Sequence, residues 1–240
     1  MFGQEGYGLR LEWGGEGVAA LGGLCAVLVV VDVLSFTTAV DVVVERGGRV
    51  RPVRWLDRAS ATPSPQWTLR PSSLDTVPPG TVLDLPSPNG ATLCATAGST
   101  GATVLAGCLR NASAVAAAAL TIADGRPIGV IPAGERWGID INTTGPEQFF
   151  GPLRPSVEDF LGAGAILSAL LARVPGTASV EAQVAADAYL GVGPRLASAV
   201  ADSVSGRELV GAGHAGDVEV ATRVNVSKAA PRLVDGLLQG

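Results

Sequence analysis

The stretch Leu24-Cys-Ala-Val-Leu-Val-Val-Val-Asp-Val33 decides the fold class of this chain. It is short, continuous and rich in β-branched residues, which is typical of a strand covered on both faces. The apolar spacing from Thr37 to Glu45 predicts a helix, and the glycines after Arg46 mark its end. Val50 to Trp55 predicts a second strand, so the three segments form a β-α-β unit. Such a unit places Asp32 at the carboxyl end of its strand, where open α/β sheets bind ligands.

Strands and helices continue to alternate along the rest of the chain. We expect strands at 81–85, 103–106 and 128–131, and helices at 111–125, 156–173, 180–190 and 194–204. A segment rich in Pro and Ser, 57–80, predicts a surface excursion, and the tail 207–238 predicts short strands and loops. The fold class is α/β, with three α/β/α layers around a largely parallel or mixed sheet. Residues 1–240 are expected to form a single compact unit, with two lobes, 1–125 and 126–240, as the alternative.

Composition excludes several classes of protein. With 47% apolar and 16% charged residues the chain is not disordered, and a net charge of −5 argues against a nucleic-acid partner. The longest apolar run, Leu24 to Val31, is too short to span a membrane and lacks the basic start of a signal peptide. Three cysteines without a C-x-x-C pair indicate reduced thiols in a cytoplasmic protein. The Ala-rich and Leu-rich helices fit either core packing or contact with a second subunit in a homo-oligomer.

Small polar and acidic side chains follow four of the predicted strands. Asp32, Asn89, Asn111 and Glu135 each come within a few residues of a strand end. Because the carboxyl ends of parallel strands meet at one edge of a sheet, we expect these side chains to converge on a functional site. Any one of them alone is as readily explained by a loop or helix cap.

Several of these segments are suited to binding an anion. Thr37 and Thr38 open a helix, whose free N–H groups attract negative charge. Pro88 to Thr92 forms a tight turn that exposes further N–H groups, although an ordinary Asn-Gly turn has the same sequence. Arg110 is either a solvated side chain or a phosphate clamp, and the sequence leaves both open.

Two adjacent acids, Glu158 and Asp159, begin the helix after a long polar loop. Ser156-Val-Glu-Asp159 matches a capping box, in which Asp159 satisfies the helix start. The same pair is consistent with a magnesium site, because Mg²⁺ prefers carboxylate oxygens and retained waters.

Two other sequence motifs match a known functional pattern only in part, and we reject both. Gly211 to Gly216 matches G-x-G-x-x-G, but no β-α-β unit can follow it, so we reject a dinucleotide site there. The only histidine, His214, lies in that segment and is expected to be structural. Haloacid-dehalogenase phosphatases also have an aspartate at the end of a strand, but they have a second aspartate two residues later. Leu34 stands at that position here, so this family does not fit.

An ordered set of motifs resembles the 2-phosphosulfolactate phosphatase family. They are Val29-Val-Val-Asp-Val-Leu-Ser-Phe-Thr-Thr38, Ser87-Pro-Asn-Gly-Ala91, Gly107-Cys-Leu-Arg-Asn-Ala112, Pro132-Ala-Gly-Glu135 and Val157-Glu-Asp-Phe-Leu-Gly-Ala-Gly164. The resemblance implies an α/β fold and magnesium-dependent hydrolysis of a phosphate monoester of a small acid, which in the family serves coenzyme M synthesis. The partner would be a small anionic phosphorylated substrate.

The resemblance and the residue types together define a set of expected roles. Mg²⁺ would be held by Asp32, Glu135 and Asp159, and Glu158 would join Asp32 and Glu135 as a catalytic group. The substrate-binding residues would be Ser35, Thr37, Thr38, Asn89, Gly90, Arg110 and Asn111.

Three positions depart from the family pattern: Ser35 replaces its usual Arg, Pro88 precedes Asn-Gly in place of Thr, and Asn225 stands where an acid is common. Losing a cation should weaken the binding of a multiply charged acid, unless Arg110 or Arg136 compensates. Two alternatives follow, a non-catalytic anion-binding relative and an isochorismatase-like hydrolase that would use Cys108 as its nucleophile.

Overall fold

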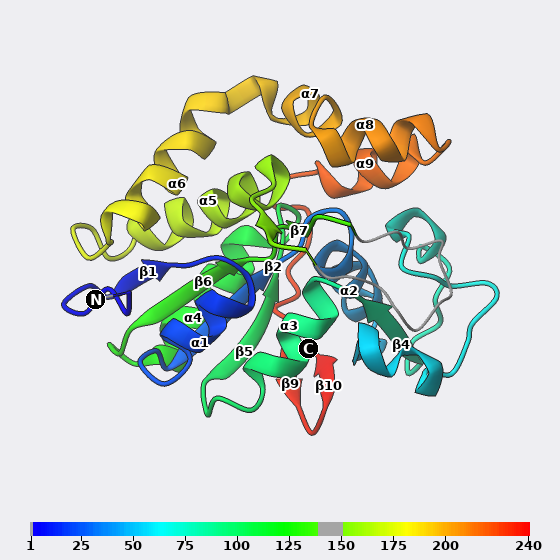
Figure 1. The fold of residues 1–240 in the computed structure, drawn as a ribbon, viewed down its shortest axis with the longest axis horizontal. Helices are drawn as coiled ribbons and strands as arrows, with labels where there is room; N and C mark the ends of the chain where they lie inside the picture. Colours follow the sequence, from blue (N-terminus) through cyan, green and yellow to red (C-terminus); the bar gives the residue numbers. More distant parts are fainter. Residues whose placement is uncertain (1, 139–150) are drawn as a thin grey trace.

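The computed structural model describes residues 2–138 and 151–240. Its main feature is a mixed eight-stranded sheet in the order β1-β6-β2-β5-β9-β10-β3-β4 (Figure 1). These strands are β1 (Leu9–Leu11), β2 (Val27–Val31), β3 (Arg49–Arg54), β4 (Val82–Ser87), β5 (Thr103–Gly107), β6 (Ile128–Pro132), β9 (Arg232–Val234) and β10 (Leu237–Gln239). A separate antiparallel pair joins β7 (Glu135–Arg136) to β8 (Leu153–Arg154).

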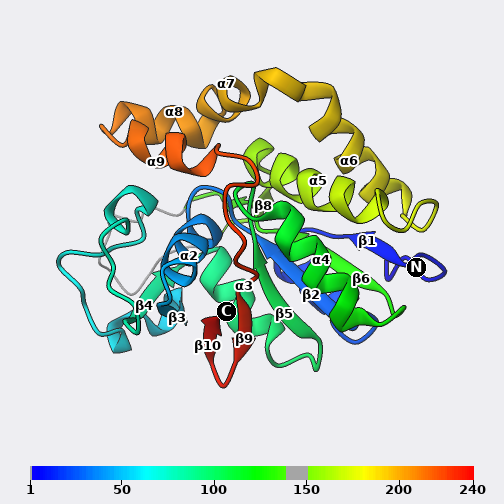
Figure 2. The same ribbon diagram turned by 180° about the vertical axis from the view of Figure 1, so that it is seen from behind.

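Helices cover both faces of this sheet (Figures 1 and 2). They are α1 (Gly14–Leu21), α2 (Phe36–Glu45), α3 (Gly90–Ala97), α4 (Ala112–Ala123), α5 (Val157–Leu171), α6 (Val180–Val192), α7 (Leu196–Ala201), α8 (Val204–Gly211) and α9 (Ala215–Ala221). Short 3-10 turns lie at Trp55–Ser60, Pro71–Ser73 and Gly193–Arg195. The α/β class and the mixed sheet that the sequence predicts are therefore confirmed.

The central strand β2 divides the core into two layers. Val27, Val29 and Val31 pack with α4, α5 and α6, whereas Leu28 and Val30 pack with α1, α2 and α3. Successive side chains of a strand point to opposite faces, so a strand with helices on both sides must be apolar throughout. This is why the unbroken valine run was a reliable signal.

The strands around β2 are parallel and share one carboxyl edge. β2 pairs in parallel with β5 on one side and with β6 on the other, and β6 also pairs with β1. Because β6 lies between β1 and β2, the sheet crosses the boundary near residue 125 at which two lobes would meet. The predicted β-α-β unit needs correction, since β5, β9 and β10 separate β2 from β3.

The C-terminal hairpin joins the two parallel parts of the sheet. β9 contacts β5 through the pair Leu105 and Arg232, and β10 contacts β3 through Leu238 and Val50. Before this hairpin, the tail forms the helices α8 and α9 rather than the strands and loops that we expected. None of the helices that the structure describes is long and apolar enough to cross a bilayer.

Helix α2 forms against its intrinsic propensity. Its sequence, FTTAVDVVVE, is rich in β-branched residues, which lose side-chain freedom in a helix. Every residue from Phe36 to Val44 is nevertheless buried, so tertiary packing outweighs this cost. The helix thereby starts one short loop after β2 and directs its first N–H groups at Asp32.

Candidate active site

Three strand ends and one helix start meet at the carboxyl edge of the sheet. Asp32 follows β2 directly, Glu135 follows β6, Asn89 lies between β4 and α3, and Glu158 is in the first turn of α5. The prediction that strand ends converge is confirmed for Asp32, Asn89 and Glu135, which are linked by the contacts described below.

Asp32 lies between the N-termini of two helices. Its Oδ2 accepts a hydrogen bond of 2.7 Å from the Gly90 N–H at the start of α3, and its Oδ1 accepts one of 3.3 Å from the Phe36 N–H at the start of α2. Only 5% of the residue is exposed. Helix N-termini favour a negative charge, so these contacts hold the carboxylate in one orientation.

Burial works against that negative charge. It raises the pKa of Asp32 to about 6, with a further contribution from the charge of Glu158, although the N–H groups of Gly90 and Phe36 oppose the rise. Burial likewise raises the pKa of Glu135 to about 7, and the charges of Asp32 and Glu158 add to it. The three carboxyl groups thus repel one another in a site from which water is largely removed.

Asn89 connects the β4–α3 turn to the loop after β6. Its Nδ2 donates a hydrogen bond of 2.8 Å to Oε2 of Glu135. The next residue, Gly90, donates its N–H to Asp32. A single turn therefore positions two of the acids. The sequence predicted this turn but not the helix α3 that follows it.

Asp159 holds three segments together. Its Oδ1 accepts from the Val33 N–H at 2.7 Å, and its Oδ2 accepts from the Gly134 N–H at 2.9 Å and from the Ser156 hydroxyl at 2.9 Å. Ser156 makes no side-chain hydrogen bond to the helix N-terminus, so the expected capping box is wrong. Burial, with the charges of Asp32 and Glu158, raises the pKa of Asp159 well above its usual value.

Glu158 differs from its neighbour. Its side chain is 2% exposed, and no donor among residues 2–138 and 151–240 makes a hydrogen bond to its carboxylate. Its charge instead raises the pKa of Asp32, Glu135 and Asp159. Of the two acids at the start of α5, Glu158 has the carboxylate that is available for a ligand.

The hydroxyl groups of Thr37 and Thr38 already have partners within the loop. Thr37 Oγ1 donates to the Asp32 carbonyl at 2.8 Å, and Thr38 Oγ1 donates to the Val33 carbonyl at 2.8 Å. Asn111 similarly accepts from the Cys108 N–H at 2.8 Å and donates to the Ala106 carbonyl. All three side chains are fully buried, and these contacts shape the loops that follow β2 and β5.

Arg110 is directed away from the acidic group. Its guanidinium pairs with Asp41 at 2.8 Å and Glu45 at 3.0 Å, both on α2. It also lines a different pocket, with Ser72 and Arg223. The structure therefore does not bring it to the site. Ser35 is half-buried at the start of α2, after a cis Leu34–Ser35 peptide bond, and its hydroxyl makes no hydrogen bond to a described residue.

The reactive groups of the alternative chemistries lie outside this arrangement. Burial raises the pKa of the Cys108 thiol to about 12 and that of Cys25 to about 11, so neither forms a nucleophilic thiolate at neutral pH. Cys108 is fully buried, which argues against an isochorismatase-like hydrolase. His214 precedes α9, with its Nδ1 2.6 Å from an Arg70 nitrogen, as expected for a structural residue.

Comparison with known proteins identifies the family. The model of the 2-phosphosulpholactate phosphatase family matches residues 77–236, two thirds of the chain. The chain belongs to this family. Its members are phosphoric monoester hydrolases, and the chain is a phosphatase of this type. A comparison with curated proteins finds no match.

The family match begins after Asp32, Ser35, Thr37 and Thr38. Three of the acids, Glu135, Glu158 and Asp159, and the Asn89-Gly90 turn lie within the matched residues. The hydrogen bond from Gly90 to Asp32 joins the two parts. Asp32 thereby contacts the matched part of the chain directly.

The carboxylate oxygens of this site are of the kind that magnesium prefers, but they are not arranged as a finished metal site. Among the described residues, no three His, Cys, Asp or Glu side chains form a group that could hold a metal ion. The buried Asp32 and Glu158 and the half-buried Glu135 nevertheless offer mutually repelling carboxylates that a divalent cation would stabilise. Asp159 fits less well than Asp32, because its oxygens accept three hydrogen bonds of 2.7–2.9 Å, two of them on Oδ2, whereas each oxygen of Asp32 accepts one.

Sequence reasoning missed two parts of this site. It expected free N–H groups at the start of α2 and in the Pro88–Thr92 turn, but as donors to an anionic ligand and not, as found for Phe36 and Gly90, to the Asp32 carboxylate. It also did not single out Arg154, whose charge lowers the pKa of Glu135. Arg154 lies on β8, which pairs with β7, and nothing in the local sequence indicates that contact.

A Gly90→Ala substitution tests the contact between α3 and Asp32. A Cβ atom at Gly90 would lie 2.6 Å from Asp32 Oδ2 and 2.7 Å from the Phe36 ring. We expect a loss of about 1–3 kcal/mol in the free energy of unfolding, together with reduced activity. Chemical denaturation and phosphate release would measure both. Gly101→Asn is a matched control, because that glycine lies in open space with a positive φ that Asn tolerates; an equal loss there would contradict the assignment.

The acidic group predicts an unusual pH dependence of stability. Asp32 and Glu135 bind protons more tightly in the folded chain, with pKa values of about 6 and about 7. The stability that these two groups contribute should therefore be greatest below about pH 4 and be lost as the pH rises to about 7, by on the order of 2–4 kcal/mol. Denaturation at pH 5 and pH 8 measures this fall, and a Glu135→Gln variant should show a smaller one. A stability that increases over this range would contradict the raised pKa values.

Proposed function

We propose that the chain is a magnesium-dependent phosphatase that hydrolyses the phosphate monoester of a small organic acid, 2-phosphosulfolactate or a related 2-phospho acid. The observation that carries this proposal is the Asp32 carboxylate, held between two helix N-termini beside Glu135 and Glu158. Carboxylates placed where helix N–H groups also converge can bind a cation and an anion side by side.

Asp32, Glu135 and Glu158 are the residues that would hold Mg²⁺. When bound, the cation would neutralise charge on the phosphate oxygens. Gly90 and Phe36 keep the Asp32 carboxylate in position through their N–H groups, and Asn89 does the same for Glu135. Most of the catalytic effect would come from such fixed positioning, as is usual for phosphoryl transfer.

Glu135 is the best placed proton carrier. Its pKa of about 7 means that it holds a proton part of the time at neutral pH. This holds for the metal-free site; with Mg²⁺ bound, the cation would favour the ionised form, and Glu135 could then accept a proton from water only if it stays outside the metal coordination. Ser35, with its free hydroxyl at the start of α2, is the side chain of the β2–α2 loop that remains available to the phosphate.

The test is phosphate release from a panel of phosphorylated small acids, including 2-phosphosulfolactate and 2-phospholactate, with Mg²⁺ and with EDTA. We expect release that requires Mg²⁺. Release that is unchanged in EDTA would overturn the role of the metal. Binding of these acids by folded protein without any release would instead support the non-catalytic alternative.

A further inference from the structure

A pocket of about 260 Å³ lies beside the acidic group. Its wall includes Arg54 at the end of β3, Arg136 on β7, Asn89 before α3, and the apolar side chains of Trp55 and Leu93. This volume is below the roughly 300–1,000 Å³ of sites that enclose drug-sized ligands. The pocket therefore suits a small organic molecule rather than a nucleotide.

The charged groups of the pocket wall are all cationic. Arg54 and Arg136 line it, and no Asp or Glu does so among the residues that the structure describes. Arg54 is exposed and has no hydrogen bond or ion pair with a described residue. Arg136 contacts Glu16 at 3.2 Å, but the Glu16 side chain is 74% exposed, so the pair is weak. Arg54 can therefore bind an anion directly, and Arg136 can do so at the small cost of its pair with Glu16.

The pocket and the acidic group share part of one wall. Asn89 lines the pocket and donates its amide to Glu135. Arg136 directly follows Glu135, and Ala133 of the pocket wall precedes Gly134, which binds Asp159. Because the Asn89 amide is 2.8 Å from Glu135, a molecule of a few carbon atoms in the pocket would lie close to the acids.

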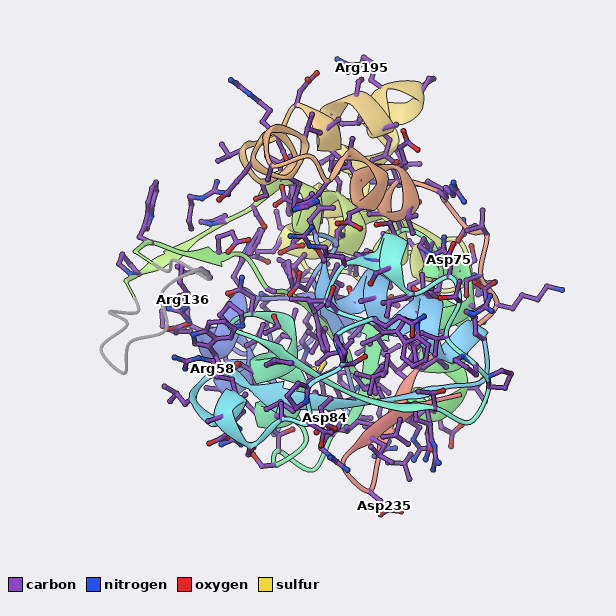
Figure 3. All side chains as sticks on the ribbon, turned by 90° about the vertical axis from the view of Figure 1, so that its right-hand side faces the viewer. Arg58, Asp75, Asp84, Arg136, Arg195 and Asp235 are labelled. Carbon is purple, nitrogen blue, oxygen red and sulfur yellow. The ribbon has the colours of Figure 1, made fainter. Side chains whose placement is uncertain are left out.

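Trp55 has a fixed place in this wall. The Arg58 guanidinium lies over its ring, 4.7 Å from the centroid. Arg58 and Arg136 are on the same side of the molecule in Figure 3.

We infer that this pocket binds a second anionic group of the substrate, a carboxylate or sulfonate, through Arg54 and Arg136. The inference rests on the proposed function, in which Mg²⁺ held by Asp32, Glu135 and Glu158 would bind the phosphate. An arginine can bind either anion through two parallel N–H contacts. Trp55 and Leu93 then contact the short carbon chain. Arg54 and Arg136 become specificity-determining residues that select phosphorylated acids against neutral phosphate esters.

The test compares two substrates that differ only in the second anion. These are 2-phospholactate and 1-hydroxypropan-2-yl phosphate, in which CH₂OH replaces the carboxylate. For Arg54→Gln and for Arg136→Gln, we expect the ratio of kcat/KM between acid and neutral ester to fall by about tenfold or more. Arg49→Gln is the matched control, because Arg49 is an exposed residue at the other end of the same strand. It should leave the ratio unchanged.

A binding measurement keeps the two proposals separate. Titration calorimetry with sulfoacetate, in the absence of Mg²⁺, should show binding to the wild type that Arg54→Gln weakens by a similar factor. If both esters are hydrolysed and the ratio is the same in all variants, the anion subsite is overturned and the phosphatase stands. If neither ester is hydrolysed but sulfoacetate binding depends on Arg54, the subsite stands and the proposed reaction fails.

Discussion

Phosphate release should fall by about 10³-fold or more when Asp32 is replaced by asparagine, measured at saturating Mg²⁺ with the best substrate of the panel. The carboxylate lies at the point where the starts of α2 and α3 meet, and it is the acid that both helices position. The amide keeps the shape but removes the negative charge. A cation bound there would lose its most firmly held ligand.

The asparagine amide also places a hydrogen-bond donor opposite a backbone N–H donor. Gly90 and Phe36 donate to different oxygens of Asp32, and in asparagine one of these acceptors becomes an NH₂ group. A drop of about 1–3 kcal/mol in stability is therefore expected beside the loss of activity. Circular dichroism and denaturation would show whether the variant is folded under the assay conditions.

Two further variants make the result interpretable. Asp187→Asn changes an exposed aspartate on α6 and should leave activity unaltered. Glu135→Gln removes a second acid without disturbing the Gly90 and Phe36 contacts, and we expect a loss of about 10²-fold or more. Full magnesium-dependent turnover by a folded Asp32→Asn protein would show that the reaction occurs elsewhere.

The sequence predicted the fold best in the central strands, because a strand buried on both faces must consist of apolar residues. The valine run of β2 predicts a central strand, and a central strand between two parallel neighbours fixes where Asp32 must lie. The same reasoning located β5 and β6 within one or two residues. Packing imposes these patterns, so they can be seen without a structure.

Short helices with glycine at their start were missed for the opposite reason. Helix α1 begins Gly14-Gly-Glu-Gly17, and α3 begins with Gly90, which follows Pro88-Asn89 and reads as part of an Asn-Gly turn. Glycine lowers helix propensity by about 1 kcal/mol, so a local pattern predicts a turn. In α3 the glycine is required by a contact distant in sequence, because Asp32 occupies the space of a Cβ atom.

The roles of individual polar side chains could not be predicted, because the spacing of residues in the sequence does not show which partners a side chain contacts in the fold. Thr37, Thr38 and Asn111 match an anion-binding pattern, yet each bonds to the backbone of its own loop. Arg110 matches a phosphate clamp, yet it pairs with Asp41 and Glu45, which lie about one turn apart on α2. The cations that do line the pocket, Arg54 and Arg136, come from separate strands.

Replacing Asp159 by alanine should cause the largest loss of stability in the site, about 2–4 kcal/mol in the free energy of unfolding. The substitution leaves the Val33 N–H, the Gly134 N–H and the Ser156 hydroxyl without their acceptor. Each buried donor that stays unpaired costs about 1–3 kcal/mol. Part of this cost is offset, because burial raises the pKa of Asp159 and its charge is itself unfavourable.

Glu158→Gln is the matched control, because the neighbouring residue is just as deeply buried but accepts no hydrogen bond from a described residue. We expect its stability to change by less than about 1 kcal/mol, and relief of the repulsion with Asp32 could even raise it. Its activity and its affinity for Mg²⁺ should fall, whereas a folded Asp159 variant should keep most of its Mg²⁺ affinity. Calorimetric titration of Mg²⁺ separates the two residues. If Asp159→Ala abolished Mg²⁺ binding without destabilising the fold, Asp159 would be a metal ligand and the roles assigned to these two acids would be reversed.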